Sequence, residues 1–124
     1  FNILVDRKNP MAANAAIEKA MKAMEKGTNV VIFPEGTISK DVPQMRPFKN
    51  GAFKVALQLK IPIVPISLPD NYKLLEDSMK WSAKARPGKS RVIIHPPVAI
   101  EKYSSEDLLP LREETKSIIA SKLD

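Results

Sequence analysis

The sequence predicts an α/β fold in which a mainly parallel or mixed sheet is flanked by helices. Short apolar runs that are typical of buried strands alternate along the chain with segments whose apolar residues recur at helical spacing. This strand–helix–strand order favours parallel pairing with right-handed crossovers. The chain has 124 residues, of which 44% are hydrophobic and 27% charged, so we expect one folded unit over residues 1–124. Strands are expected at 3–5, 30–33, 61–68 and 91–94, and helices from about Asn9, Asn50 and Pro110.

The first strand and the first helix have clear boundary signals. Residues 3–5 form a continuous apolar run, and Asn9-Pro10 then offers an N-cap residue followed by proline at the first helical position. Gly27 is expected to end this helix as a C′ residue. The apolar face of the helix, which we assign to core packing, consists of Ala13, Ile17, Ala20, Met21 and Met24.

Two further apolar runs frame the middle of the chain. Residues 30–33 are expected to form a buried strand that ends in a loop at 34–37. The run at 61–68 contains Pro62 and Pro65. Each proline removes a ladder donor, so this strand is expected to be irregular or to lie near a sheet edge. The predicted apolar face of the helix between the two runs is Ala52, Val55, Ala56 and Leu59.

The C-terminal part is expected to contain a turn, a strand and a helix. Residues 86–89 place proline and glycine at the two central positions of a type II turn. Residues 91–94 follow as a strand, and the last helix starts near Pro110. Its apolar side consists of Leu111, Thr115, Ile118, Ile119 and Leu123.

The net charge of +6 is concentrated in the middle of the chain. Residues 40–100 carry eleven bases against four acids, which is +7, and residues 78–100 contain no acid. Such a region attracts phosphate groups in nucleic acids, lipid headgroups or metabolites, although a solvated face without a ligand stays open as the alternative. The absence of Cys excludes disulfides and cysteine zinc sites, and a single His argues against a metal centre. Aromatic residues are too sparse for nucleic-acid stacking, and Trp81 suits either a lipid interface or packing.

The loop after the second predicted strand is the best candidate for chemistry. Glu35-Gly36-Thr37 offers a carboxylate, a backbone that can turn sharply and a hydroxyl. Because ligands of α/β sheets bind beyond the carboxyl ends of the strands, Arg7 is placed beside this loop, and Lys49 adds a second cation. Two structural alternatives stay open: Glu35 accepts hydrogen bonds from the loop backbone, or Arg7 pairs with a carboxylate.

Nucleophilic catalysis finds little support in the sequence. Ser39 does not lie in a GxSxG elbow, and the chain has no cysteine. His95, the single histidine, ends a predicted strand before two prolines, a position more typical of a structural side chain than of a catalytic base.

Four segments, at 3–7 (ILVDR), 31–39 (VIFPEGTIS), 48–53 (FKNGAF) and 61–66 (IPIVPI), carry a resemblance in their order and spacing. Together they resemble the glycerolipid acyltransferase family, the 1-acylglycerol-3-phosphate (lysophosphatidate) acyltransferases. The family's signature at the second segment is Phe-Pro-Glu-Gly-Thr-Arg-Ser. The resemblance covers residues 3–68, and the expected strand and helix after it are family-like.

The resemblance implies transfer of a fatty acyl group from acyl-CoA or acyl-carrier protein to the free hydroxyl of 1-acylglycerol-3-phosphate in phospholipid biosynthesis, without a cofactor. In this family a histidine, followed by aspartate after four intervening residues, acts as general base. That pair is not in this sequence, since His95 has Ile100 at the matching position. We therefore expect the chain to be the C-terminal part of an acyltransferase domain, with no catalytic residue of its own and inactive alone.

The resemblance also implies which residues bind the acceptor's phosphate and glycerol. They are Arg7, Glu35, Gly36 and Thr37, and Lys49 is added because Ile38 stands where the family commonly has arginine. The expected partners are a lysophosphatidate-type lipid, the acyl donor and the cytoplasmic face of a membrane, with no nucleic acid. Self-association through an exposed sheet edge is a further expectation. The alternative function is a non-enzymatic module that binds anionic lipid or phosphate through the basic middle region.

Overall fold

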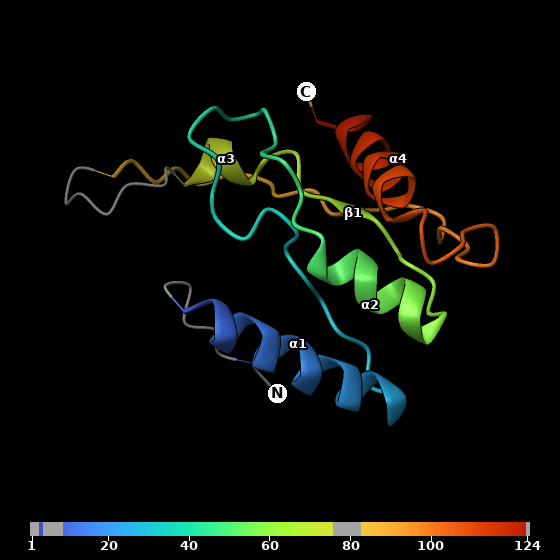
Figure 1. Cartoon of the computed structure of the whole chain (residues 1–124). Helices are drawn as coiled ribbons and strands as arrows, with labels where there is room; N and C mark the ends of the chain where they lie inside the picture. The colour runs from blue at the N-terminus through green and yellow to red at the C-terminus, as the bar shows by residue number, and fades with distance from the viewer. Residues whose placement is uncertain (1–2, 4–8, 76–82, 124) are drawn as a thin grey trace.

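The structure is a computed structural model that describes Ile3 and residues 9–75 and 83–123. Four helices and one short two-stranded antiparallel sheet make up this part of the chain (Figure 1). The elements are α1 (Pro10–Glu25), α2 (Gly51–Leu59), β1 (Ile66–Ser67), α3 (Asn71–Leu74), β2 (Ile93–Ile94) and α4 (Leu108–Ala120). The predicted strand at 3–5 lies outside the described residues except for Ile3.

Helix α1 begins and ends as the sequence predicts. The side chain of Asn9 accepts a hydrogen bond from the Met11 N–H at 2.9 Å, which satisfies one of the orphan donors of the first turn. Gly27 has φ +82°, and its N–H bonds to the Met24 carbonyl. Together with the bond from Thr28 N–H to Ala23 O, this is a Schellman motif, which requires a residue that adopts positive φ without strain.

Helix α2 is confirmed, but its buried face is rotated from the predicted one. The buried residues are Phe53, Val55, Ala56 and Leu57. The prediction missed Phe53 and Leu57 because α2 is covered from several sides, by α1 and α4 as well as by loops. At its first residue, a Cβ on Gly51 would lie 2.6 Å from Ile17 Cδ1, so glycine allows α1 to pack closely there.

The sheet is shorter than predicted and antiparallel. Ile66 pairs with Ile94 and Ser67 with Ile93, and an isolated bridge joins Ile63 to Val98. This irregular ladder agrees with the two prolines in the run at 61–68. Parallel pairing is not observed in the described part of the chain and stays a prediction.

The predicted strand at 30–33 is not found. These residues have no ladder partner among the described residues, and Val31 and Phe33 are 76% and 73% exposed. The sequence pattern predicted a buried strand from apolar character alone, whereas a strand also needs a neighbouring backbone to pair with.

The segment after β1 contains an unpredicted helix and corrects a predicted turn. Helix α3 is a single turn at 71–74. The type II turn at 86–89 is wrong, because it requires positive φ at Gly88 and the described glycines with positive φ are Gly27 and Gly36. Gly88 instead allows close packing: a Cβ there would lie 2.5 Å from Leu74 Cδ2.

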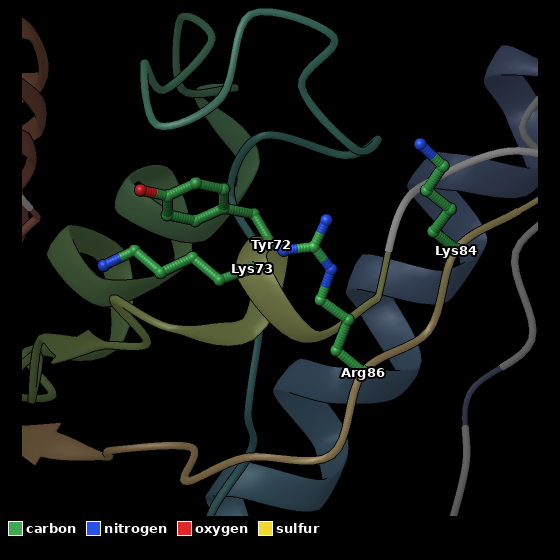
Figure 2. A pocket seen from close by; sticks show the side chains of 4 residues that line it. All are labelled: Tyr72, Lys73, Lys84 and Arg86. Carbon is green, nitrogen blue, oxygen red and sulfur yellow. The ribbon is translucent and has the colours of Figure 1, made fainter.

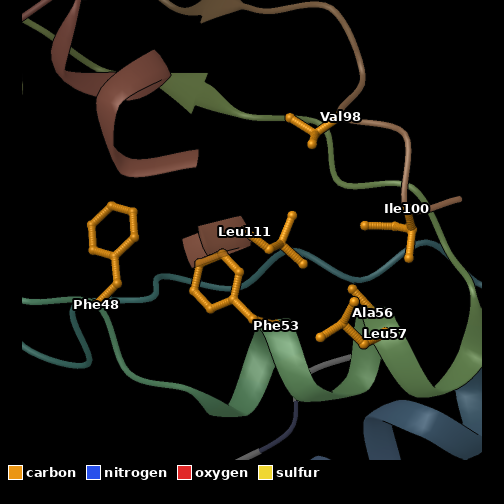
Figure 3. Close-up of a cluster of buried hydrophobic side chains, with 7 residues drawn as sticks. All are labelled: Phe48, Phe53, Ala56, Leu57, Val98, Ile100 and Leu111. Atoms are coloured by element: carbon orange, nitrogen blue, oxygen red, sulfur yellow. The ribbon is translucent and has the colours of Figure 1, made fainter. Parts of the chain in front are cut away.

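The core lies where α2, the 98–100 segment and the start of α4 meet (Figure 3). It is the cluster of Phe48, Phe53, Ala56, Leu57, Val98, Ile100 and Leu111. Phe48 and Phe53 stack with ring centroids 6.3 Å apart. Helix α4 begins two residues before the predicted start, and its buried residues are Leu111 and Thr115, both on the predicted face. In the described part of the chain, no helix has the length and apolar character that a membrane crossing requires.

Candidate functional site: the loop around Glu35, Gly36 and Lys49

The loop after residues 30–33 turns sharply at Gly36. Its φ is +67°, in the left-handed region that disfavours side chains, and its N–H donates to the Phe33 carbonyl at 3.1 Å. The prediction of a backbone that needs glycine at this position is confirmed.

Lys49 lies directly over this turn. Its backbone N–H donates to the Pro34 carbonyl at 2.8 Å, which ties the start of the loop to its far end. Its side chain fills the space that a Cβ on Gly36 would take, with Cε 2.8 Å and Nζ 3.2 Å from that position. Thus the structure brings together two of the predicted site residues, a glycine and a cation thirteen positions apart.

Glu35 braces the same loop. Its Oε2 accepts a hydrogen bond from the Arg46 backbone N–H at 2.7 Å. This is the structural alternative that the sequence left open for Glu35, and it makes the carboxylate a support for the loop. Because the bond uses the Arg46 backbone, the Arg46 guanidinium is not engaged by it.

A hollow of about 360 Å³ lies beside the braced loop, formed by the chain between Ser39 and Pro47. It is lined by Ser39, Lys40, Asp41, Gln44, Met45, Arg46 and Pro47. Ser39 is buried, and its Oγ accepts a hydrogen bond from the Asp41 N–H, so it shapes the loop wall. Lys40 and Arg46 were not among the predicted site residues. The sequence did offer an indication of both, because they are basic residues that lie between the loop at 34–37 and Lys49.

The remaining predicted site residues have different outcomes. Thr37 is exposed beside Gly36, and Ile38 is also exposed to solvent, so the position where the family commonly has arginine faces outward. Arg7 lies outside the described residues, and its placement beside the loop stays a prediction. In the described part of the chain, the loop therefore brings together Gly36, the Lys49 side chain and the Arg46 backbone, which Glu35 holds by a hydrogen bond.

His95 has a structural role. Ser67 Oγ donates its proton to the Ile119 carbonyl at 2.9 Å and therefore accepts from His95 Nε2 at 2.8 Å. These bonds fasten the end of α4 to the small sheet. The residues described contain no group of three or more His, Asp or Glu side chains that could hold a metal ion.

Comparisons with known proteins agree with this signature. The acyltransferase family profile matches residues 2–69, more than half of the chain. The 1-acyl-sn-glycerol-3-phosphate acyltransferase BAT2 of Brassica napus chloroplasts is 35% identical over 95% of this chain and 32% of its own length. The 1-acyl-sn-glycerol-3-phosphate acyltransferase alpha of Mus musculus is 34% identical over 92% of this chain and 39% of its own length.

A probable 1-acyl-sn-glycerol-3-phosphate acyltransferase of Mycoplasma pneumoniae is 34% identical over 72% of this chain and 33% of its own length. The chain thus spans about a third of the length of the curated relatives it matches. No solved structure matches it significantly. With the family profile covering the braced loop, Lys49 and the proline-bearing strand, the chain belongs to the acyltransferase family.

Proposed function

We propose that this chain forms the acceptor-binding part of a 1-acylglycerol-3-phosphate acyltransferase. The observation that carries the proposal is the placement of the Lys49 side chain over the sharp turn at Gly36. A turn with positive φ and an ammonium group beside it suit a phosphate, which accepts charge-assisted hydrogen bonds. Family membership and the names of the relatives support the choice of acceptor.

Each residue of the loop has a distinct part in this proposal. Lys49 and Arg7 bind the phosphate of the acceptor, and Thr37 donates a hydrogen bond to its glycerol. Gly36 leaves room for the Lys49 side chain. Glu35 acts as a positioning residue through the Arg46 N–H.

In the proposed reaction the acceptor's free hydroxyl attacks the thioester carbonyl of acyl-CoA or acyl-carrier protein. A new ester C–O bond forms, the C–S bond breaks, and the hydroxyl proton passes through a base to the thiolate that leaves, which gives the free thiol. The sequence contains no histidine followed by aspartate after four residues, and His95 is engaged by Ser67. We therefore assign substrate binding to this chain and expect no acyl transfer from it alone.

Three further expectations belong to the same proposal. The complete protein acts at the cytoplasmic face of a membrane, where lysophosphatidate-type acceptors reside. In the complete protein, residues 30–33 pair in a parallel sheet, and this pairing would cover the Val31 and Phe33 side chains that are exposed here. The 124-residue chain by itself self-associates through this apolar segment.

The binding step can be tested on the chain itself with sn-glycerol 3-phosphate as the probe. In an NMR titration, we expect amide shifts at Gly36, Thr37 and Arg46. Lys49→Ala should weaken the affinity by at least tenfold, because a hydrogen bond to a charged group contributes about 1.5–3 kcal/mol. Lys54→Ala, which removes an exposed lysine from α2, is the matched control and should bind as the wild type does.

Equal affinity of Lys49→Ala and the wild type would contradict the assignment of Lys49. The catalytic half of the proposal is tested in the complete protein, where Arg7→Ala should abolish acyl transfer to lysophosphatidate while the circular dichroism spectrum is kept. Normal turnover of that variant would contradict the assignment of Arg7 to the site.

A further inference from the structure

Helix α4 contacts the chain at the residue that follows Lys49. Nη1 of Arg112, near the start of α4, donates a hydrogen bond to Oδ1 of Asn50 at 2.7 Å. The two residues are 62 positions apart in the sequence. Arg112 also lies beyond residues 2–69, which the family profile matches. The C-terminal helix therefore reaches the segment that carries Lys49, although the profile of the family ends before this helix begins.

The Asn50 side chain is used for this contact and not for helix capping. Asparagine is among the residues that cap helices best, because its side-chain oxygen accepts a hydrogen bond from a free N–H of the first turn. Asn50 stands directly before α2, yet its side chain makes no such bond. Its backbone carbonyl still accepts a helical bond from the Lys54 N–H at 2.9 Å. The amide oxygen of Asn50 thus serves to join the start of α2 to α4.

Lys49 is supported through both of its neighbours in the sequence. Before it, Phe48 is 4% exposed and belongs to the same buried cluster as Leu111, the residue next to Arg112 on α4. After it, Asn50 is bonded to Arg112. These two contacts fix the backbone from which the Lys49 side chain extends over the sharp turn of the acceptor loop.

Arg112 and Lys49 differ in what their charged groups contact. Each nitrogen of the Arg112 guanidinium has a partner: Nη1 bonds to Asn50, while Nε and Nη2 lie 3.0 and 2.9 Å from Oε1 of Glu113. The Lys49 ammonium makes no hydrogen bond or ion pair with the described residues. Arg112 is therefore committed to the fold, and Lys49 stays available to an anion.

The cations beside α3 are arranged differently. Lys73 and Arg86 line a hollow together with Tyr72, and Figure 2 shows them directed toward opposite ends of the Tyr72 side chain. Lys73 Nζ also lies 3.7 Å from the Asp70 carboxylate and 5.4 Å from the centre of the Tyr72 ring. These cations do not converge on one ligand, so the hollow offers no arrangement comparable with the supported Lys49.

We propose that Arg112 is a positioning residue of the acceptor site. This inference rests on the proposed function, and it adds α4 to the site through the hydrogen bond from Arg112 to Asn50. The bond restricts the positions that the Lys49 backbone can adopt. Less conformational entropy is then lost when the ammonium binds the phosphate of the acceptor. Support of this kind raises affinity although the supporting side chain does not touch the ligand.

A titration of the 124-residue chain with sn-glycerol 3-phosphate tests the inference. Arg112→Ala should weaken the affinity about 2- to 10-fold, the range that one intramolecular hydrogen bond contributes. Arg112→Lys keeps a donor for Asn50 and should restore most of the affinity. Lys116→Ala, which removes a cation one turn further along α4, is the matched control and should bind as the wild type does. Thermal unfolding of each variant shows whether the fold is intact.

A double-mutant cycle tests the route through Asn50. Asn50→Ala should weaken the affinity as Arg112→Ala does, and the double variant should bind no more weakly than either single variant. A second readout needs no ligand. In NMR spectra of the free chain, Arg112→Ala should shift the amide resonances of Lys49 and Gly36, whereas Lys116→Ala should leave them in place.

Three results overturn the inference, and they differ in what they leave standing. Wild-type affinity of Arg112→Ala, together with weak binding by Lys49→Ala, would contradict the role of Arg112 and keep the acceptor site. Additive losses for Arg112→Ala and Asn50→Ala would mean that the two side chains act independently, which contradicts positioning through their hydrogen bond. Absence of sn-glycerol 3-phosphate binding by the wild type would overturn the proposed function and the positioning role together.

Discussion

The segment at 30–49 and the region at 50–120 use apolar residues in opposite ways. In the C-terminal region, Phe53, Ile100 and Leu111 meet in one buried cluster that joins α2 to α4. In the earlier segment, Val31, Phe33 and Ile38 point to solvent, and the backbone is held by single hydrogen bonds such as Lys49 N–H to Pro34 O. The difference shows which part carries the stability of this chain and which part carries the proposed ligand site.

Carboxylates reflect the same division. Asp70 binds both the backbone and the side chain of Arg91, so that cation is committed to the fold. Glu35 accepts a hydrogen bond only from the backbone N–H of Arg46. This bond holds the loop, and the Arg46 side chain stays exposed to solvent. A substitution of a buried residue in the C-terminal region should therefore act on stability, and one in the loop should act on binding.

The largest effect is expected for Leu111→Ala in the core. Leu111 has no exposed surface and belongs to the cluster between α2 and α4, so its truncation leaves a cavity. We expect the free energy of unfolding to fall by about 2–5 kcal/mol in urea denaturation. Leu109→Ala on the same helix is the matched control, since Leu109 is exposed, and should change it by about 0.5 kcal/mol or less. Similar losses for both variants would contradict the core assignment.

A smaller effect, which depends on pH, is expected for Asp70→Asn. Hydrogen bonds from Arg91 lower the pKa of Asp70 from its ordinary value of 3.8, so this group adds stability that is complete above that value. That contribution disappears as the pH falls further and the folded-state carboxylate becomes protonated. We expect the wild type to lose stability below about pH 4 more steeply than Asp70→Asn does. At pH 7 the variant should be the less stable of the two.

Thermal unfolding between pH 7 and pH 2 measures this difference in slope. Asp107 and Glu114 also have lowered pKa values, through hydrogen bonds from Ser104 and Lys102 respectively, and give both proteins a common acid dependence. Glu101→Gln, which removes an exposed acid, is the control and should follow the wild-type curve. Parallel curves for Asp70→Asn and the wild type would mean that Arg91 does not stabilise the ionised carboxylate.

Local signals in the sequence predicted the helices well and the sheet poorly. Asn9, Pro10 and Gly27 define α1 because caps depend on neighbours only a few residues away. Residues 30–33 have the composition of a strand, but pairing depends on a distant backbone that composition does not encode. Gly88 shows the same limit: Pro-Gly predicted a turn, while in the structure Gly88 packs closely against Leu74.

Some residues of the candidate site were predictable from the sequence, but their roles were not. Gly36 and Lys49 were selected from the sequence, and their contact needed the fold to bring them together. Arg46 was missed although it lies in the basic region, and its contact with Glu35 through the backbone N–H depends on the fold. Substitutions of Glu35 give the clearest comparison of the loop with the core.

The smallest effect on stability, and a clear effect on binding, is expected when Glu35 is changed. Glu35→Ala removes one exposed hydrogen bond, so the free energy of unfolding should fall by about 1 kcal/mol or less. The affinity for sn-glycerol 3-phosphate should nevertheless fall, because the loop that carries Gly36 and Lys49 loses its tie to Arg46. Glu35→Gln keeps an oxygen that can accept from the Arg46 N–H, so it should restore most of the affinity. If Glu35→Gln binds as weakly as Glu35→Ala, the carboxylate charge itself is needed and Glu35 contacts the acceptor directly. If both variants bind like the wild type, the brace at Glu35 does not shape the site.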